Sequence, residues 1–182
     1  MRLFVGIALA TEAQRALESF VRDLREAFPR LRWSLPEQWH VTLQFLGETE
    51  ESRYACVVRQ LRMIQTQAVE VRLVQPGFFE RAGVFHITVQ PTQSLIALHE
   101  KTEQTLVSCG FEPEVRAYSP HITLARKKGR GRSADFEQLQ QVVLKYAAIK
   151  LPSFIAGEFL LYQSLTEAAG AKYEVRDRFR LM

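Results

Sequence analysis

The hydrophobic pattern at the start of the chain predicts a strand followed by a helix. Residues 2–9 form an apolar run typical of a buried strand. Apolar side chains then recur at helical spacing from Ala13 to Phe28, and the proline that follows ends the helix. Thr11 and Gln14 have the spacing of a capping box, so we expect Thr11 to cap this helix.

A second strand and a second helix are expected next. Residues 39–46 alternate between apolar and polar side chains, which is typical of a strand with one buried face. Strict alternation predicts two faces, one made by Val41, Leu43 and Phe45 and the other by His40, Thr42 and Gln44. A helix from Thr49, a strand over residues 69–74 and a turn at residues 76–77 follow.

The second half of the chain repeats this order of elements. We expect a strand over residues 83–90, a helix that begins after Thr92 and ends at Gly110, and a strand over residues 121–125. Asp135 is expected to cap a further helix. Its inward side chains would be Phe136, Leu139, Val142, Val143 and Tyr146.

Two strands, over residues 154–163 and 172–181, complete the predicted elements. The last one alternates three arginines with apolar side chains. We interpret Arg176, Arg178 and Arg180 as a solvated or edge-strand face, and the alternative is that they line a nucleic-acid groove.

An offset of 81 positions aligns the two halves of the chain with each other. It brings residues 40–43 onto residues 121–124, and residues 2–17 onto residues 83–98 with four identities. We interpret this match as an internal duplication, with repeats at residues 1–78 and 82–182 of a single domain. The expected fold class is α+β, with two pseudo-symmetric β-sheet lobes, helices packed outside, and a cleft between the lobes that carries two H-x-T motifs.

Three of the four histidines stand two residues before a threonine: His40, His86 and His121. The offset pairs His40 with His121 and leaves His86 on the strand that begins the second repeat. Because side chains alternate along a strand, the histidine and threonine of each motif share a face, about 7 Å apart. We therefore expect His40, His121, Thr42 and Thr123 to converge in the cleft. His86 is expected to contact the substrate base or to sit half-buried, and not to act as an acid–base partner.

Two such histidines suit general acid–base catalysis, since free imidazole titrates near pH 6.5 and one ring can be neutral while the other is protonated. Threonine hydroxyls can donate hydrogen bonds to phosphate oxygens whose charge grows in the transition state. Residues 126–132 carry five positive charges directly after the second motif, which favours a phosphate-binding loop. Strict alternation would put Arg126 on the face opposite His121, so its role as a phosphate ligand requires the strand to end or bulge there. These features indicate metal-independent phosphodiester chemistry on RNA.

The composition is that of an ordinary globular protein, with 47% hydrophobic and 24% charged residues and a net charge of +4. No apolar run has the roughly 20 residues that a membrane-spanning helix needs. The N-terminal apolar run is short, contains Gly6 and leads directly into a helix, so we interpret it as a strand rather than a signal peptide. Cys56 and Cys109 fall in helix-like segments. Without an export signal we expect a cytoplasmic protein in which both cysteines are reduced. We also expect the protein to be a monomer.

Other kinds of site have less support in the sequence. No G-x-S-x-G or H-E-x-x-H string occurs, and we interpret His99 and Glu103, four residues apart, as a helix surface rather than a metal site. Phe45, Phe78 and Phe79 are candidates for base stacking, although buried aromatic side chains are the commoner case. Two alternatives remain open. One is a phosphodiesterase acting on a small cyclic phosphate or a 2′-5′ oligonucleotide. The other is a non-catalytic RNA-end binder, which would be expected to have lost one motif.

The strings HVTLQFLGE and SPHITLAR resemble the two signatures of the two-histidine phosphoesterase superfamily. More narrowly, they resemble those of the bacterial RNA 2′,3′-cyclic phosphodiesterases, also described as 2′-5′ RNA ligases. RLFVGIAL, LLYQS and the terminal G-x-K-Y-E-V-R segment extend the resemblance over nearly the whole chain. The departure from the family pattern is His86, which stands where relatives tend to carry an apolar or aromatic residue.

This resemblance implies hydrolysis of RNA ends that carry a 2′,3′-cyclic phosphate, leaving a 2′-phosphomonoester, without metal, cofactor or membrane partner. It implies that His40 is the proton donor, that His121 is the proton acceptor which activates water, and that Thr42 and Thr123 hold the phosphate. Arg126 lies in the family-like string H-I-T-L-A-R. The resemblance also implies that the same site can ligate two RNA ends by the reverse reaction, without ATP.

Overall fold

The fold is that of a computed structural model, which describes residues 1–145, 149–167 and 170–182. Its first half contains β1 (Arg2–Ala8), α1 (Thr11–Ala27), β2 (Arg32–Trp33), a 3₁₀ turn η1 (Pro36–Gln38), β3 (His40–Glu48), α2 (Glu51–Leu61) and β4 (Val69–Phe79). Its second half contains β5 (Val84–Gln90), α3 (Gln93–Leu106), a 3₁₀ turn η2 (Val107–Cys109), β6 (His121–Arg126), α4 (Ala134–Val143), β7 (Ser153–Ala156), β8 (Glu158–Glu167) and β9 (Gly170–Arg180).

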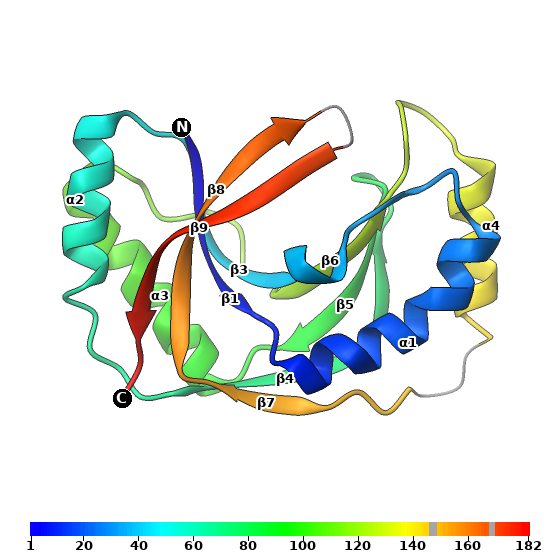
Figure 1. Ribbon diagram of the computed structural model, residues 1–182, viewed down its shortest axis with the longest axis horizontal. Helices are drawn as coiled ribbons and strands as arrows, with labels where there is room; N and C mark the ends of the chain where they lie inside the picture. Colours follow the sequence, from blue (N-terminus) through cyan, green and yellow to red (C-terminus); the bar gives the residue numbers. More distant parts are fainter. Residues whose placement is uncertain (146–148, 168–169) are drawn as a thin grey trace.

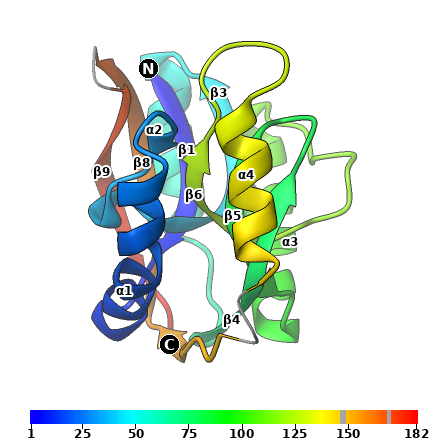
Figure 2. The ribbon, with the colours of Figure 1, turned by 90° about the vertical axis from the view of Figure 1, so that its right-hand side faces the viewer.

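These strands form two antiparallel sheets, and the α+β class is confirmed. One sheet has the order β3-β1-β8-β9, and the other has the order β2-β6-β5-β4-β7. Figure 1 shows α1 and α4 at one end of the molecule and α2 and α3 at the other, with the sheets between them. In the view turned by 90°, α1 and α4 both face the reader (Figure 2).

The two halves of the chain exchange strands. β8, from the second half, pairs with β1, while β4, from the first half, pairs with β5. The order β3-β1-β8 in one sheet therefore corresponds to β6-β5-β4 in the other. An internal duplication would produce this correspondence, and the two repeats remain a prediction.

Buried side chains from both sheets and all four helices form one large hydrophobic cluster. The regular spacing of apolar residues explains the helices, since Ala13, Leu17, Val21 and Leu24 make the buried face of α1. No helix among the described residues is both long enough and apolar enough to cross a membrane.

Several predicted helix caps and ends need correction. Ala10, not Thr11, is the N-cap of α1 and makes no side-chain capping bond, so the predicted capping box is absent. Thr92 caps α3 as expected, because its side chain accepts a hydrogen bond from the backbone N–H of Leu95. Ser133 caps α4 in place of Asp135, which lies in the first turn and pairs with Arg30. The predicted inward position of Tyr146 lies outside the described residues.

Both motif strands contain a β-bulge directly after the H-x-T sequence. In β3, Thr42 pairs with Gly6 and Gln44 with Val5, so Leu43 has no partner in β1. In β6, Thr123 pairs with His86 and Ala125 with Phe85, so Leu124 has no partner in β5. The extra residue shifts the alternation by one position in each strand.

The bulges correct the faces predicted from strict alternation. Gln44 is buried, whereas Phe45 is 64% exposed and lies on the same side of β3 as His40. Arg126 occupies the corresponding place in β6 and lines the same hollow as His121. The bulge thus removes the obstacle that alternation placed in the way of Arg126 as a phosphate ligand.

The expectation of two reduced cysteines is wrong. Cys56 in α2 and Cys109 at the end of η2 form a disulfide, with their Cα atoms 5.8 Å apart. The sequence did not reveal this bond because the two residues are 53 positions apart. Packing of α2 against α3 brings them together.

Candidate active site

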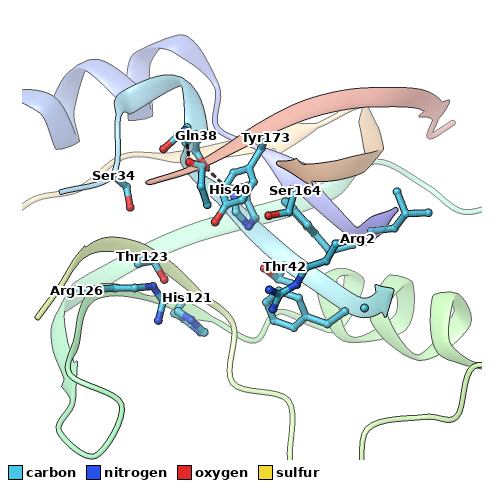
Figure 3. A pocket seen from close by; sticks show the side chains of 15 residues that line it. Arg2, Ser34, Gln38, His40, Thr42, His121, Thr123, Arg126, Ser164 and Tyr173 are labelled. Carbon is cyan, nitrogen blue, oxygen red and sulfur yellow. Dashed lines mark hydrogen bonds between the residues drawn. The ribbon is translucent and has the colours of Figure 1, made fainter. Parts of the chain in front are cut away.

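The two H-x-T motifs face each other across a hollow of about 380 Å³ between the sheets. His40, Thr42, His121, Thr123 and Arg126 all line it, as the close-up in Figure 3 shows. β3 supplies the first pair and β6 supplies the other three. The cleft geometry expected from the repeat is therefore present, and the sequence-predicted site residues lie together.

Each motif histidine is oriented by a backbone carbonyl two residues before it. His40 Nδ1 lies 2.7 Å from the carbonyl oxygen of Gln38, and His121 Nδ1 lies 2.8 Å from that of Ser119. A carbonyl oxygen can only accept, so Nδ1 of each ring carries a proton and donates it. Nε2 of each ring is then the atom left to accept or donate a proton in chemistry. Gln38 and Ser119 are also 81 positions apart, so the orientation follows the offset of the motifs.

His40 stands in an aromatic environment that disfavours its charged form. Its ring centroid lies 4.6 Å from that of Phe4, 5.2 Å from that of Tyr173 and 5.6 Å from that of Tyr162. This burial lowers the pKa of His40 from 6.5 to about 4. The carbonyl of Gln38 opposes the shift, whereas the nearby charges of His121 and Arg126 add to it.

His121 has a similar cradle on the opposite sheet. Its ring meets the edge of Phe79 at 4.8 Å and that of His86 at 5.4 Å between centroids. Burial lowers the pKa of His121 below 6.5, and the charge of Arg126 acts in the same direction. The hydrogen bond to Ser119 opposes the shift. Both imidazoles are thus largely neutral in the ligand-free protein at neutral pH.

The hollow contains polar residues that the sequence reasoning did not identify. They are Arg2, Ser34, Gln38, Ser164 and Tyr173. Figure 3 shows the Arg2 side chain alongside Thr42. The sequence did contain a signal for Arg2, since strict alternation along the first strand puts its side chain on the same face as Phe4. Ser164 and Tyr173 gave no local signal, since the pairing of β8 with β1 brings them to the site.

His86 is placed by β5 rather than by the motif strands. It is 5% exposed, so the expectation of a half-buried or base-contacting side chain is wrong. Its ring stacks on Phe79 at 4.1 Å, because Gly77 on the neighbouring strand leaves room for it. Burial lowers the pKa of His86 to about 4, with the charge of His121 as a second cause. The neutral ring of His86 therefore packs against the ring of His121.

His99 is also buried, which corrects its interpretation as helix surface. Its Nδ1 donates to the carbonyl of Leu43 at 2.9 Å, and its Nε2 lies 3.5 Å from Glu103 Oε2. Tyr118 stacks on its ring at 3.8 Å. No group of three or more His, Cys, Asp or Glu side chains that could hold a metal ion occurs in the part of the chain that the structure describes. His99 and Glu103 of α3 are thus part of the packing beneath β3.

A second, wider hollow of about 700 Å³ adjoins the first and shares Thr42, Phe45 and His121 with it. Its walls include the aromatic side chains of Phe78, Phe79 and Tyr118. Phe78 and Phe79 are half-buried, whereas Phe45 is largely exposed. The exposed position of Phe45 corrects the core position that we expected for it. Its ring is therefore available for base stacking.

The chain is similar in sequence to several curated proteins. It is 27% identical to an RNA 2′,3′-cyclic phosphodiesterase of Geobacillus stearothermophilus, over 98% of this chain but only 57% of that relative's length. It is 24% identical to the RNA 2′,3′-cyclic phosphodiesterase of Methanocaldococcus jannaschii, over 96% of this chain and 98% of the relative.

Solved structures show the same fold. The apo crystal structure of E. coli LigT superposes with a TM-score of 0.79 at 22% identity and covers 99% of this chain and 96% of LigT. The crystal structure of a Thermus thermophilus protein, TT0787, gives a TM-score of 0.76 at 23% identity, covering 99% and 97%.

The family model of the 2′-5′ RNA ligase superfamily matches residues 10–160, which include both H-x-T motifs. This match covers well over half of the chain. The protein therefore belongs to the 2′-5′ RNA ligase superfamily.

Proposed function

We propose that this protein hydrolyses RNA ends that carry a 2′,3′-cyclic phosphate to 2′-phosphomonoesters. The observation that carries the proposal is the convergence of two carbonyl-oriented histidines, two threonines and Arg126 on one hollow. The similarity to RNA 2′,3′-cyclic phosphodiesterases supports the same activity. We further propose that the protein acts as a cytoplasmic monomer and uses no metal or cofactor.

In the proposed reaction, Nε2 of His121 accepts a proton from a water molecule, whose oxygen attacks phosphorus in line with the bond to the 3′ oxygen. Nε2 of His40 donates its proton to the leaving 3′ oxygen as the P–O3′ bond breaks, so the phosphate stays on the 2′ oxygen. Hydroxyls of Thr42 and Thr123 donate hydrogen bonds to the non-bridging oxygens, where negative charge grows. The Arg126 guanidinium supplies the charge that a phosphate requires.

The lowered pKa values require the protonation of His40 to change when substrate binds. A His40 with a pKa of about 4 is neutral in the free protein at neutral pH and could not donate. The negative charge of a cyclic phosphate lying between the rings raises the pKa of both histidines. His40 then gains the proton that it delivers to the leaving oxygen.

The main experiment is cleavage of a short RNA with a 2′,3′-cyclic phosphate, in EDTA, by the wild type, His40→Ala, His121→Ala and His86→Ala. Each acid–base residue contributes typically 10²- to 10⁴-fold, so we expect losses of that size in the first two variants. His86→Ala should lose less than tenfold. Equal loss in all three variants, or no opening of the cyclic phosphate by the wild type, would refute the proposal. The product should carry a 2′-phosphate, and a 3′-phosphate would reverse the proposed substrate orientation.

The donor and acceptor roles can be separated with bis(4-nitrophenyl) phosphate, whose leaving group needs no proton. His40→Ala should then lose much less activity than it loses on the cyclic RNA, because a donor is no longer required. His121→Ala should lose as much as before, because water must still be activated. The opposite pattern would exchange the two roles.

The same site could join two RNA ends. A 5′-hydroxyl end in place of water, together with a 2′,3′-cyclic phosphate end, gives a 2′-5′ linkage under microscopic reversibility. This ligation needs neither ATP nor additional residues. Incubating the cleavage substrate with a 5′-hydroxyl oligonucleotide and sequencing across the product would detect it.

A further inference from the structure

Two arginines stand side by side at the rim of the candidate active site. Arg32 of β2 is the direct cross-strand partner of Arg126 of β6, and both side chains are exposed. Like charges directly opposite each other in a sheet are destabilising. Among the described residues, neither guanidinium forms an ion pair with a carboxylate. An anion lying between the two arginines would remove this repulsion.

The basic segment that follows is held in place by its first lysine. The backbone N–H of Lys127 donates to the carbonyl of Gly83 at 2.9 Å, and its Nζ donates to the carbonyl of Gly131 at 2.7 Å. Gly83 has a φ of 61°, and a Cβ there would meet the Lys127 side chain at 2.3 Å, so only glycine permits this contact. Lys127 is thus occupied in closing the loop.

The loop points two other cations outward. Arg132 pairs with Glu137, whereas Lys128 and Arg130 are exposed and form no ion pair with any described residue. Lys128 also lines a shallow hollow of about 460 Å³ together with Arg30 and Asp135, which neutralise each other. Uncompensated positive charge is therefore present at Arg126, at its cross-strand partner Arg32, and at Lys128 and Arg130 of the loop that follows β6.

The arginines of β9, the other basic strand near the cleft, are engaged differently. Arg178 pairs with Glu158 at 2.6 Å, and Arg176 donates to the side chain of Gln163 at 2.9 Å. These contacts agree with the solvated face predicted for this strand. On the β2–β6 side, in contrast, uncompensated charge begins at Arg126 in the hollow and continues onto the loop that follows β6.

We propose that RNA leaves the active site along this basic track, defined as Arg126, Arg32, Lys128 and Arg130. The inference rests on the proposed function. A cyclic phosphate closes the 3′ end of an RNA, so the chain on its 5′ side must exit the hollow. The backbone phosphates of the next few nucleotides then lie against Arg32, Lys128 and Arg130. The partner is single-stranded RNA of several nucleotides rather than a cyclic mononucleotide.

Binding tests the track without requiring turnover. The probe is a fluorescein-labelled single-stranded RNA decamer with a 2′-phosphate, measured by fluorescence anisotropy between 50 and 200 mM salt. For single strands each neutralised phosphate contributes about 0.7 to the slope of log K against log salt. Arg32→Gln should lower the slope by about 0.7, and Lys128→Gln/Arg130→Gln by about 1.4, with an affinity loss of about tenfold for the double variant.

The matched controls are Arg59→Gln on α2, an exposed cation at the opposite end of the molecule, and Arg59→Gln/Lys101→Gln as a double variant. Neither should change the slope by more than a few tenths. Thermal melting of each track variant should show an unchanged or raised Tm, because Arg32→Gln removes a like-charge contact. Equal slope changes in track and control variants, or equal competition by polyglutamate and by unlabelled RNA, would overturn the proposal.

Kinetics supply the second readout. The ratio of kcat/KM for a decamer ending in a 2′,3′-cyclic phosphate to that for a cyclic mononucleotide should fall about tenfold in Lys128→Gln/Arg130→Gln. An unchanged ratio would overturn the track while leaving the proposed function intact. A wild type that opens neither substrate would refute the proposed function, and the binding slopes would still decide the track.

Discussion

Tyr118 connects the two motif strands through a single hydroxyl. It stands three residues before His121, and its hydroxyl donates to the carbonyl oxygen of Thr42 at 3.0 Å. His99, on whose ring it stacks, donates to the next carbonyl of β3, that of Leu43. These two carbonyls belong to the bulge of β3, so Tyr118 and His99 are positioning residues that hold the bulge in shape.

Tyr118→Phe should separate positioning from packing. The ring stays stacked on His99, but the hydrogen bond to Thr42 is lost, which typically costs about 1 kcal/mol of unfolding free energy. Because the bulge would loosen, we expect kcat for cyclic phosphate opening to fall several-fold, with a smaller change in KM. Urea unfolding and steady-state kinetics measure the two effects.

Tyr54→Phe is the control for this prediction. Tyr54 donates to Asp177 at 2.7 Å away from the hollow, so its loss should lower stability without changing kcat. Equal effects of the two substitutions on kcat would show that Tyr118 acts through stability alone.

The lowered pKa values also predict the pH at which kcat/KM is highest. In the proposed reaction one histidine is neutral and the other protonated, so we expect kcat/KM to rise through the lower pKa and to fall through the higher one. These macroscopic values belong to the pair. In the free protein they lie at about 4 for His40 and below 6.5 for His121, so the maximum of kcat/KM should lie between pH 4 and 6.5.

The pH profile of kcat should lie higher than that of kcat/KM, because it reports the complex in which bound phosphate raises both pKa values. Initial rates from pH 4 to 9 at low and saturating substrate would measure the two profiles. A kcat/KM maximum above pH 7 would contradict the pKa shifts on which the prediction depends.

At the scale of elements, local patterns predicted the helices well and the strand details poorly. Helical spacing depends on neighbours along the chain, so the buried face of α1 could be read from the sequence. A bulge depends on the partner strand, so the outward turn of Phe45 and Arg126 could not. The turn predicted at Pro76 is likewise wrong. β4 continues through it to Phe79, because β5 pairs with residues on both sides.

Gly77 of β4 lies just beyond the register shift between Leu73 and Pro76, and its neighbours require glycine there. A Cβ at this position would lie 2.7 Å from Nε2 of His86 and 3.2 Å from the hydroxyl of Thr88. Gly77→Ala should therefore destabilise the fold by about 1–3 kcal/mol, the usual cost of overpacking a core. Urea unfolding would measure this loss.

A double-mutant cycle identifies the cause of that loss. His86→Ala empties the space into which the new methyl group would project, so Gly77→Ala should cost clearly less in the His86→Ala background. The coupling should exceed about 0.5 kcal/mol, the limit for independent sites. Additive costs would show that the backbone of β4, not the contact with His86, requires glycine.

At the scale of the whole molecule, the two halves are interlocked. Each half contributes two strands to the sheet of the other, and each end of the molecule contains one helix from either half (Figure 1). Sequence comparison of the halves predicted which histidines pair, because the motifs keep their offset. It could not predict the disulfide, since Cys56 and Cys109 are not equivalent positions of the two halves.

The disulfide joins the halves covalently, and this gives a test of the interlocked fold. The bond links two residues that are 53 positions apart and so closes a loop in the unfolded chain. The loss of entropy in the unfolded chain stabilises the fold by up to about 4 kcal/mol. Cys56→Ala/Cys109→Ala should lose about 2–4 kcal/mol of unfolding free energy, the typical range for a disulfide. Activity at 25 °C should stay near that of the wild type, because neither cysteine lines the hollow that contains the two H-x-T motifs. Dithiothreitol should destabilise the wild type by a similar amount and leave the double variant unchanged. If dithiothreitol affects neither protein and both unfold at the same urea concentration, the disulfide does not contribute to holding the two halves together.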